Sequence, residues 1–426
     1  MDQVDSSVEW IGKVPSTWAI EPLAHRFRER NTTVSDAEYP PLSVTRDGIL
    51  PQLKNVAKTG NGDARKLVRR GDLAINSRSD RRGSAGISDR DGSVSVITTV
   101  LVPHDLDGRF AHYLLRSQGF QEEYYRHGSG IVADLWSTRW SAMKTIRMAF
   151  PPPDEQRAIA EVLDHETAEI DAFIHDQEEL IRLLAERRAA TISRAVTKGL
   201  NPNSPMKDSE VDWLGEVPAD WTVTRLSRYF DVTLGKMLDE GKAAAPGSST
   251  LPYVRAANIQ EAGLDITTAN TMAFTAREQR QFSIRRGDLL VVEGGAIGVN
   301  AHISSDMPNW GFQKTVNRIR TRGHGSTRFA GYALDSLRFA GVLDMVANKS
   351  TIAHLTAEKL ERLVLAWPPT VEQEQIAEYL TNECANVDGS IEDARRAIAL
   401  LQERRAALIS AAVTGKIDVR ERVKGA

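Results

Sequence analysis

The sequence contains a single cysteine, Cys384, and no long apolar run. One cysteine excludes an internal disulfide and a cysteine-based zinc cluster. No apolar stretch approaches the ~18 residues needed to span a bilayer, and the acidic, polar start is unlike a signal peptide. We therefore expect a cytoplasmic protein with no membrane attachment. At 426 residues, with 41% hydrophobic and 26% charged residues, the chain is long enough for two to four globular domains.

Catalytic motifs are also scarce. The sequence has no Walker A motif, no Gly-x-Ser-x-Gly motif and no His-x-x-x-His pair in a predicted helix, so we expect no metal site. Residues 293–298 resemble a dinucleotide-binding loop, but Glu293 replaces its first glycine. The Pro-Pro sites lack the flanking residues expected of a base-amine methyltransferase. These absences favour binding over catalysis, with a stand-alone DNA-modifying enzyme of unrecognised motif as the alternative.

Glycine and proline are missing between Asp154 and Lys198, where apolar residues recur at helical spacing. This pattern predicts one long helix, or two nearly collinear helices, over 151–200. The same text returns over 368–417 at an offset of 217 residues, and each copy has apolar steps of 4, 7, 4, 7 and 3. Such a narrow seam is typical of a helix packed against another helix. The seam residues are Ile159, Leu163, Ile170, Ile174, Ile181 and Leu184 in the first copy and Ile376, Leu380, Val387, Ile391, Ile398 and Leu401 in the second.

We expect these two helices to pack on each other, although each could instead be an ordinary amphipathic helix on its own domain. Both copies begin with prolines followed by Glu-Gln and end near a glycine, Gly199 or Gly415, that is a plausible cap. Gly389 stands in the second copy where the first has Ala172, and we expect it to interrupt the second helix.

The remaining sequence is also duplicated. Two tryptophans around a Gly-x-Val-Pro turn occur at residues 10–18 and again at 213–221, and we interpret them as a structural clasp. The sequence Arg-Arg-Gly-Asp-Leu occurs at 69–73 and at 285–289, where a polar turn leads into a buried strand. The interiors that follow differ between the copies. Two domains that share their flanking motifs but differ in their interiors are expected of a protein that recognises two different targets.

We predict four segments. A mixed domain over 1–150 precedes a helical spacer over 151–200; a linker and second mixed domain over 201–367 precede a second spacer and tail over 368–426. The mixed domains are of α/β or α+β class with a mixed sheet. Expected strands lie at 41–44, 73–75, 94–102, 254–256, 289–292 and 315–319, expected helices at 110–121 and 327–346, an exposed linker at 199–209 and a loop at 235–249.

The net charge of -3 conceals two basic regions. Eleven Lys or Arg face five Asp between residues 46 and 90, and five basic residues face no acid between 310 and 328. Such patches indicate nucleic-acid binding, with solvated loops as the alternative. Asn and Arg side chains read bases, while cations and hydroxyls hold phosphates. Our candidate DNA-binding residues are Arg46, Lys54, Asn76, Arg78, Arg81 and Arg82 in the first half and Arg255, Asn258, Gln313, Lys314, Lys349 and Ser350 in the second.

These motifs together resemble the specificity subunit of Type I restriction-modification enzymes, over nearly the whole chain. The resemblance is carried by WIGKVPSTW and KDSEVDWLGEVPADW, the two Arg-Arg-Gly-Asp-Leu strands, INSRSDRRGSAGISDRDG, VVEGGAIG with FQKTVNRIR, and PPPDEQRAIAEVLD with LLAERRAATISRAVTKGL and their C-terminal counterparts. It implies two target-recognition domains joined by two long helices that form an antiparallel coiled coil, with an internal pseudo-two-fold repeat.

The resemblance also implies the function. Each recognition domain would read half of a bipartite, asymmetric site on double-stranded DNA. The chain itself would be non-catalytic and carry no cofactor; two modification subunits would bind S-adenosylmethionine and methylate adenine, and two restriction subunits would use ATP and Mg. A coiled-coil DNA-binding interaction protein that never meets a modification subunit is the remaining alternative.

Overall fold

The protein, seen in a computed structural model, is described for residues 2–46, 48–52, 64–78, 81–130, 136–238, 246–347 and 354–419. It forms two compact units. Unit 1 contains Met1–Gln177 and Arg395–Ala426, and unit 2 contains Glu178–Ala394. The long helices α4 (Pro153–Lys198) and α9 (Thr370–Val413) each contribute one part to unit 1 and the other to unit 2. Among the described residues, no helix is both long and apolar enough to cross a membrane.

Unit 1 is built on a four-stranded antiparallel sheet with the order β10-β9-β12-β4. Smaller antiparallel groups, β11-β8-β5, β3-β13, β1-β2 and β6-β7, surround it. The strands are β1 (Gln3–Asp5), β2 (Lys13–Pro15), β3 (Ala19–Pro22), β4 (Phe27–Glu29), β5 (Thr33–Val34), β6 (Leu42–Thr45), β7 (Gly48–Pro51), β8 (Arg65–Val68), β9 (Leu73–Asn76), β10 (Ala85–Ile87), β11 (Gly92–Val94), β12 (Thr98–Pro103) and β13 (Arg147–Phe150). The helices are α1 (Gly108–Arg116), α2 (Gln118–Arg126) and α3 (Trp140–Met143).

Unit 2 repeats this plan with the four-stranded antiparallel order β23-β22-β25-β17. Its other sheets are β21-β18-β24, β16-β26, β14-β15 and β19-β20. The strands are β14 (Met206–Asp208), β15 (Glu216–Pro218), β16 (Thr222–Arg225), β17 (Phe230–Leu234), β18 (Ser249–Val254), β19 (Ile259–Gln260), β20 (Gly263–Leu264), β21 (Asn270–Phe274), β22 (Leu289–Val292), β23 (Asn300–His302), β24 (Gly311–Phe312), β25 (Val316–Thr321) and β26 (Val364–Trp367). The helices are α5 (Ala276–Gln281), α6 (Thr327–Phe339), α7 (Val342–Ala347) and α8 (Ala357–Arg362).

The two units therefore share a strand order as well as a sequence repeat. The predicted duplication and the two sheet-rich domains are confirmed. Both four-stranded sheets are antiparallel, so the domains are α+β, and the mixed sheet that we expected is limited to one parallel pairing, β18 with β24, among the described strands. The units differ in their three-stranded sheets, which lie within the divergent interiors of the sequence repeat.

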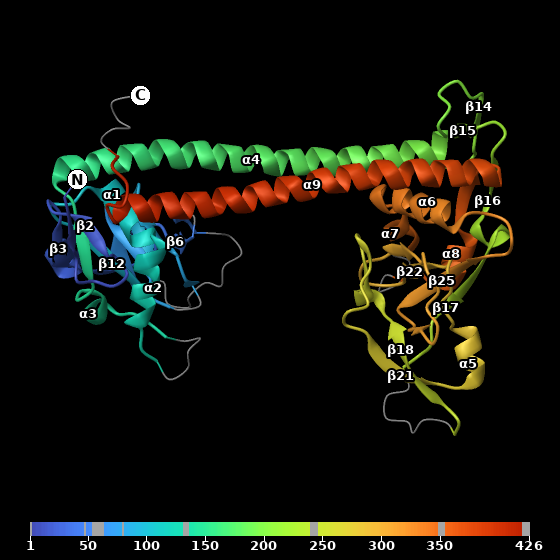
Figure 1. Cartoon of the computed structure of the whole chain (residues 1–426), viewed down its shortest axis with the longest axis horizontal. Coiled ribbons are helices and arrows are strands. Elements are labelled where there is room, and N and C mark those ends of the chain that lie inside the picture. Colours follow the sequence, from blue (N-terminus) through green and yellow to red (C-terminus); the bar gives the residue numbers. More distant parts are fainter. Residues whose placement is uncertain are drawn as a thin grey trace. The chain divides into compact units, whose positions relative to one another are not determined.

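Each unit buries its own core against the long helices. In unit 1, side chains of α1 and α2 such as Phe110 and Phe120 pack with Ile159 of α4 and Val413 of α9. In unit 2, helix α6 lies between the four-stranded sheet and α9 (Figure 1), and its apolar face packs on both. Because each core contains residues of both long helices, α4 and α9 are each part of both units.

The seam residues are buried or half-buried, as the pattern predicts. Within unit 1, the pair Arg405 Nε to Asp171 Oδ1 at 2.9 Å joins the C-terminal part of α9 to the N-terminal part of α4. Within unit 2, Arg188 Nε lies 3.1 Å from Asp388 Oδ1, joining the C-terminal part of α4 to the N-terminal part of α9. The helices are therefore antiparallel in each unit, and mutual packing rather than independent amphipathic helices is confirmed.

The glycine caps of the two long helices agree with the sequence prediction, but Gly389 and the linker differ from it. Gly199 and Gly415 have φ of +73° and +69°, the left-handed conformation of a glycine cap. α9 continues through Gly389, so our expectation of an interruption there was wrong. This glycine is exposed in the middle of the helix, with helical residues on both sides of it. The linker at 199–209 is not wholly irregular either, because β14 pairs with β15.

The short elements were predicted in outline. β9, β22 and β25 match their predicted ranges within one or two residues, and β6 lies at 42–45. The expected strand at 94–102 is divided between β11 and β12, and the one at 254–256 has only Val254 in β18. Each expected helix is two helices. Ser117 caps α2 by accepting from Phe120 N, and Gly341, with φ of +72°, separates α6 from α7.

Candidate nucleic-acid interface

The repeated Arg-Arg-Gly-Asp segment places a loop at the same point of each unit. Gly71 and Gly287 adopt φ of +90° and +87°, which turns the chain into β9 and β22. The aspartate that follows closes the turn, since Asp72 accepts from Arg69 N and Asp288 accepts from Arg285 N, both at 2.8 Å. In each unit the buried strand that follows this turn, β9 or β22, ends at a loop whose sequence differs between the two copies.

In unit 1, the divergent loop after β9 carries arginines. Ser77 anchors it by donating from its N to Ile97 O and by accepting from Thr138 N. Asn76 closes the loop, because its backbone N donates to Ser84 O at 2.9 Å and its Oδ1 accepts from Arg78 N at 3.2 Å. Asn76 is half-buried, and its backbone N and Oδ1 both form hydrogen bonds within the loop. Arg78 is half-buried and Arg81 is exposed.

Two further candidates of unit 1 meet beside this loop. Arg46, in the turn between β6 and β7, donates from Nε to Arg82 O at 3.1 Å. Arg82 lies over the ring of Tyr125 at 5.0 Å and is itself exposed. Arg116 of α1 donates to Arg46 O and adds another guanidinium. Lys54 lies outside the described residues. The structure thus brings together Arg46 and Arg82 from separate segments and adds Arg116, which the sequence analysis did not select.

In unit 2, the equivalent loop is short and carries an acid. Glu293 takes the place of Ser77: its N donates to Thr315 O at 2.9 Å and its O accepts from Leu355 N at 2.7 Å. Its side chain is half-buried, and burial raises the pKa of this carboxyl against the opposing effect of His354 and Lys314. The sequence analysis treated Glu293 only as a failed dinucleotide loop and missed this equivalence.

The second-half candidates are less accessible than the first. Asn258 is 1% exposed, with Oδ1 accepting from Arg255 N and Nδ2 donating to Asp265 O, so it holds its own loop together. Gln313 is 7% exposed and accepts from the Thr315 hydroxyl. Arg255 is half-buried, and its Nε has no hydrogen-bond partner among the described residues. Lys314 is exposed. Lys349 and Ser350 lie outside the described residues.

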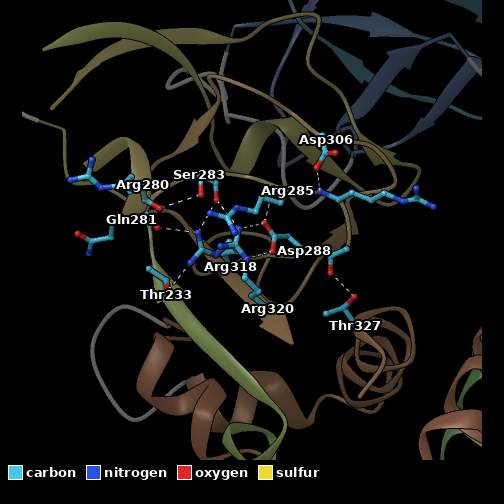
Figure 2. A network of polar contacts seen from close by, with 12 residues as sticks. Thr233, Arg280, Gln281, Ser283, Arg285, Asp288, Asp306, Arg318, Arg320 and Thr327 are labelled. Atoms are coloured by element: carbon cyan, nitrogen blue, oxygen red, sulfur yellow. Dashed lines mark hydrogen bonds and ion pairs between the residues drawn. The ribbon is translucent and has the colours of Figure 1, made fainter. Parts of the chain in front are cut away.

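The second basic region is not a surface patch. Arg318 is 6% exposed and donates to Gln281 O at 3.0 Å and to Ser283 O at 2.7 Å (Figure 2). Its guanidinium also lies over the Phe312 ring, 5.4 Å from the centroid. Burial lowers the pKa of Arg318 to about 10. Both β25 arginines are thus turned into the domain, where they hold α5 to the sheet. Our expectation of a basic patch over 310–328 was wrong at these positions.

The other basic residues of that region also have partners within unit 2. Arg320 binds Asp288 through two bonds of 2.6 and 2.7 Å (Figure 2). Arg322 pairs with Asp231 at 2.7 Å, and Arg328 donates to the Thr381 hydroxyl at 2.8 Å. Among the five, Lys314 alone has a side chain without a hydrogen bond or ion pair to another described residue, although its backbone N donates to Lys236 O at 2.9 Å. Among the described residues, no group of three His, Cys, Asp or Glu side chains lies close enough to hold a metal ion.

Comparison with known proteins supports the resemblance found in the sequence. A model described as "Type I restriction modification DNA specificity domain" matches residues 218–388. The chain is 23% identical over 286 residues to the Type I restriction enzyme MjaVIII specificity subunit of Methanocaldococcus jannaschii. The aligned region is 65% of this chain and spans 63% of the length of that relative.

Solved structures share the fold. A chain from a study of complex assembly and conformational transition in the type I R-M system matches with a TM-score of 0.66 and 16% identity, over 95% of this chain and 99% of that one. The HsdS subunit from Thermoanaerobacter tengcongensis matches with a TM-score of 0.54 and 16% identity, over 95% and 98%. The resemblance to Type I restriction-modification specificity subunits found in the sequence is therefore confirmed.

Proposed function

We propose that this chain is the DNA sequence-recognition subunit of a Type I restriction-modification complex and that each unit reads one half of a bipartite site. One observation carries the proposal. The same anchored position, at the end of β9 in unit 1 and of β22 in unit 2, supports a loop with arginines in one unit and with Glu293 in the other. A common frame with different loop chemistry suits two modules that recognise different sequences.

The chemistry of the loops suggests how each half is read. Arginine donates in pairs to guanine O6 and N7 or to phosphates, so Arg78, Arg81 and Arg82 favour guanine or the backbone. A carboxylate accepts a hydrogen bond from the exocyclic amine of cytosine or adenine, so Glu293 favours such an amine in the other half-site, with Lys314 nearby on a phosphate.

The partners follow from the family. We propose double-stranded DNA as the ligand and two modification subunits as partners, with S-adenosylmethionine bound by those subunits. Two restriction subunits with ATP and Mg would join in the full complex, in the cytoplasm. The chain would then be non-catalytic. Incubating the purified chain with DNA and labelled S-adenosylmethionine tests this, because methyl incorporation without a partner contradicts it.

We further propose that the paired helices fix the gap between the half-sites. Each is unbroken, over 46 residues in α4 and 44 in α9. Successive major-groove faces lie ~34–36 Å apart, a distance that about 23 helical residues span at ~1.5 Å each. Inserting one seven-residue repeat into both helices, within 178–188 and 395–405, preserves the seam and adds ~10 Å.

Methylation mapping measures the result of that insertion. The gap should grow by about three base pairs, since ~34–36 Å correspond to ~10 base pairs. Both half-site sequences should stay unchanged, because neither loop is altered. A gap that stays constant in the insertion variant contradicts the spacer proposal.

The recognition proposal is tested by comparing methylomes of cells with and without the gene, which gives both half-sites, and then by half-site variants. Replacing Arg78 and Arg81 by alanine should weaken binding about 10- to 100-fold when the first half-site is present, since one bidentate base contact is worth ~1–3 kcal/mol. Lys314→Ala is the reciprocal control and should leave that half-site unaffected. Equal loss on unrelated duplexes would mean that these arginines contact only the backbone.

A further inference from the structure

Unit 1 contains a cleft of about 480 Å³. Its walls come from the β6–β7 turn, the segment after β9, helices α1 and α2, and α9. We call it the arginine cleft, because Arg46, Arg82, Arg116 and Arg405 line it. Four separate segments contribute these guanidinium groups, so no window of the sequence shows them together.

The lining is strongly positive. No Asp or Glu lines the cleft among the described residues. Arg405 also binds Asp171, with Nε to Oδ1 at 2.9 Å and Nη2 to Oδ2 at 3.2 Å, and this pair fixes the side chain on α9. Gln118, Gln121 and Gln402 add amide donors to the lining, and α2 begins at Gln118, with its positive end toward the same space.

His112 supports one of the arginines without adding charge. Its Nε2 lies 3.0 Å from Arg116 Nη1, and its Nδ1 lies 3.3 Å from Ile87 N. Burial, together with Arg116 and Arg405, lowers the pKa of His112 to about 4. The imidazole is therefore neutral at physiological pH and accepts at one ring nitrogen at a time, from Ile87 N or from the Arg116 guanidinium.

The equivalent cleft of unit 2 has a different balance of charge. Arg188 there takes the place of Arg405, and Tyr332 that of Tyr113. Asp335 and Glu261 line it, however, and Arg338 pairs with Glu261 at 2.7 and 3.0 Å. The fold thus makes a cleft in each unit at the junction with the long helices. Among the described lining residues, acids occur in the cleft of unit 2 and not in that of unit 1.

We propose that the arginine cleft binds a phosphate group. Planar guanidinium groups match the tetrahedral oxygens of a phosphate through paired, charge-assisted hydrogen bonds. The source is either a backbone phosphate of bound DNA, which rests on the proposed function, or a soluble phosphate compound. Both place the same chemistry in the cleft.

The first experiment measures thermal unfolding of the full chain in sodium phosphate and in sodium chloride at equal ionic strength. Phosphate at ten times its Kd should raise the Tm of unit 1 by about 4 °C. The double variant Arg46→Gln with Arg116→Gln should lose this shift, and the matching Lys variants should keep part of it.

A second variant protects the test against misfolding. Gln402→Glu adds a carboxylate at an exposed lining position of α9 and removes no described contact. It should abolish the phosphate shift. Ala185→Glu, at the equivalent position of α4, is the matched control and should retain the shift. Full phosphate stabilisation in both Gln402→Glu and the double arginine variant would overturn the proposal.

The second experiment identifies the source by measuring Kd for a duplex carrying the site at several salt concentrations. If the phosphate belongs to DNA, the double variant should bind about tenfold more weakly, with the slope of log Kd against log salt reduced by about 1. Discrimination between the site and unrelated duplex should persist. If only the phosphate shift is lost and the slope is unchanged, the ligand is soluble. A chain that binds no DNA refutes the proposed function, while the unfolding experiment still decides the cleft.

Discussion

Replacing Asp288 by alanine should destabilise unit 2 by about 3 kcal/mol. Asp288 is 1% exposed and accepts three hydrogen bonds: 2.6 and 2.7 Å from Arg320 and 2.8 Å from Arg285 N (Figure 2). Removing one partner of a buried ion pair costs ~3–5 kcal/mol. The low end applies because the Arg320 side chain is 23% exposed and keeps its bond to Ser283 O.

Calorimetry of the full chain measures this loss as a lower Tm of the unit 2 transition, by about 6–12 °C at ~2–4 °C per kcal/mol for a unit of this size. Asp231→Ala is the matched control. Its pair with Arg322 is also 2.7 Å long, but the two side chains are 57% and 50% exposed, so the loss should be ~0–1 kcal/mol. Equal shifts for Asp288→Ala and Asp231→Ala would refute the reasoning, because burial would then not decide the cost.

Three other outcomes follow from particular residues. Stability of unit 1 should fall as pH drops from about 6.5 toward 4, by up to about 3 kcal/mol, because unfolded His112 binds a proton that the folded state excludes; His112→Gln should flatten this slope in urea titrations at each pH. Gly199→Ala should cost roughly 1–2 kcal/mol in urea unfolding, since φ is +73° and the added Cβ would lie 3.2 Å from the Trp221 ring. Gly389→Ala should instead stabilise the protein by about 0.5–1 kcal/mol, because this glycine is helical and an added Cβ would meet nothing within 4 Å. A lower free energy of unfolding for this variant would contradict the helical conformation of residue 389.

The long helices could be predicted because their signal is local and repeated. A seam sustained over more than 40 residues without glycine or proline specifies both the helix and its need for a partner. The Arg-Arg-Gly-Asp turns were equally predictable, because the aspartate that closes each turn lies three residues after the amide from which it accepts a hydrogen bond. Such features need no knowledge of distant contacts.

The short strands of the linker were missed for the opposite reason. All three residues of β14 are exposed, so no apolar alternation marks them, and their pairing with β15 is decided by backbone hydrogen bonds alone. The division of the first expected helix at Ser117 was also hidden. Its hydroxyl caps α2 within a stretch that otherwise has continuous helical spacing.

The exposure of the candidate residues was predicted better in unit 1 than in unit 2. Charge density selected Arg46 and Arg82, and both lie exposed in turns. The same criterion failed for Arg318 and Arg320, which lie on β25, an inner strand of the four-stranded sheet, where Arg318 is buried and Arg320 half-buried. Their partners are distant segments, at Gln281, Ser283 and Asp288, so a sequence window could not show that these charges are internal.

The ion pairs of the long helices connect the repeat to the packing. The offset of 217 residues that aligns the two seams also turns Asp171 into Asp388 and Arg188 into Arg405. In unit 1 the acid comes from α4 and the base from α9; in unit 2 the assignment is reversed. A tandem duplication yields such an exchange only when the two copies run antiparallel, because each copy then presents its early acid to the late arginine of the other. The same duplicated helix therefore contributes to the core of both units.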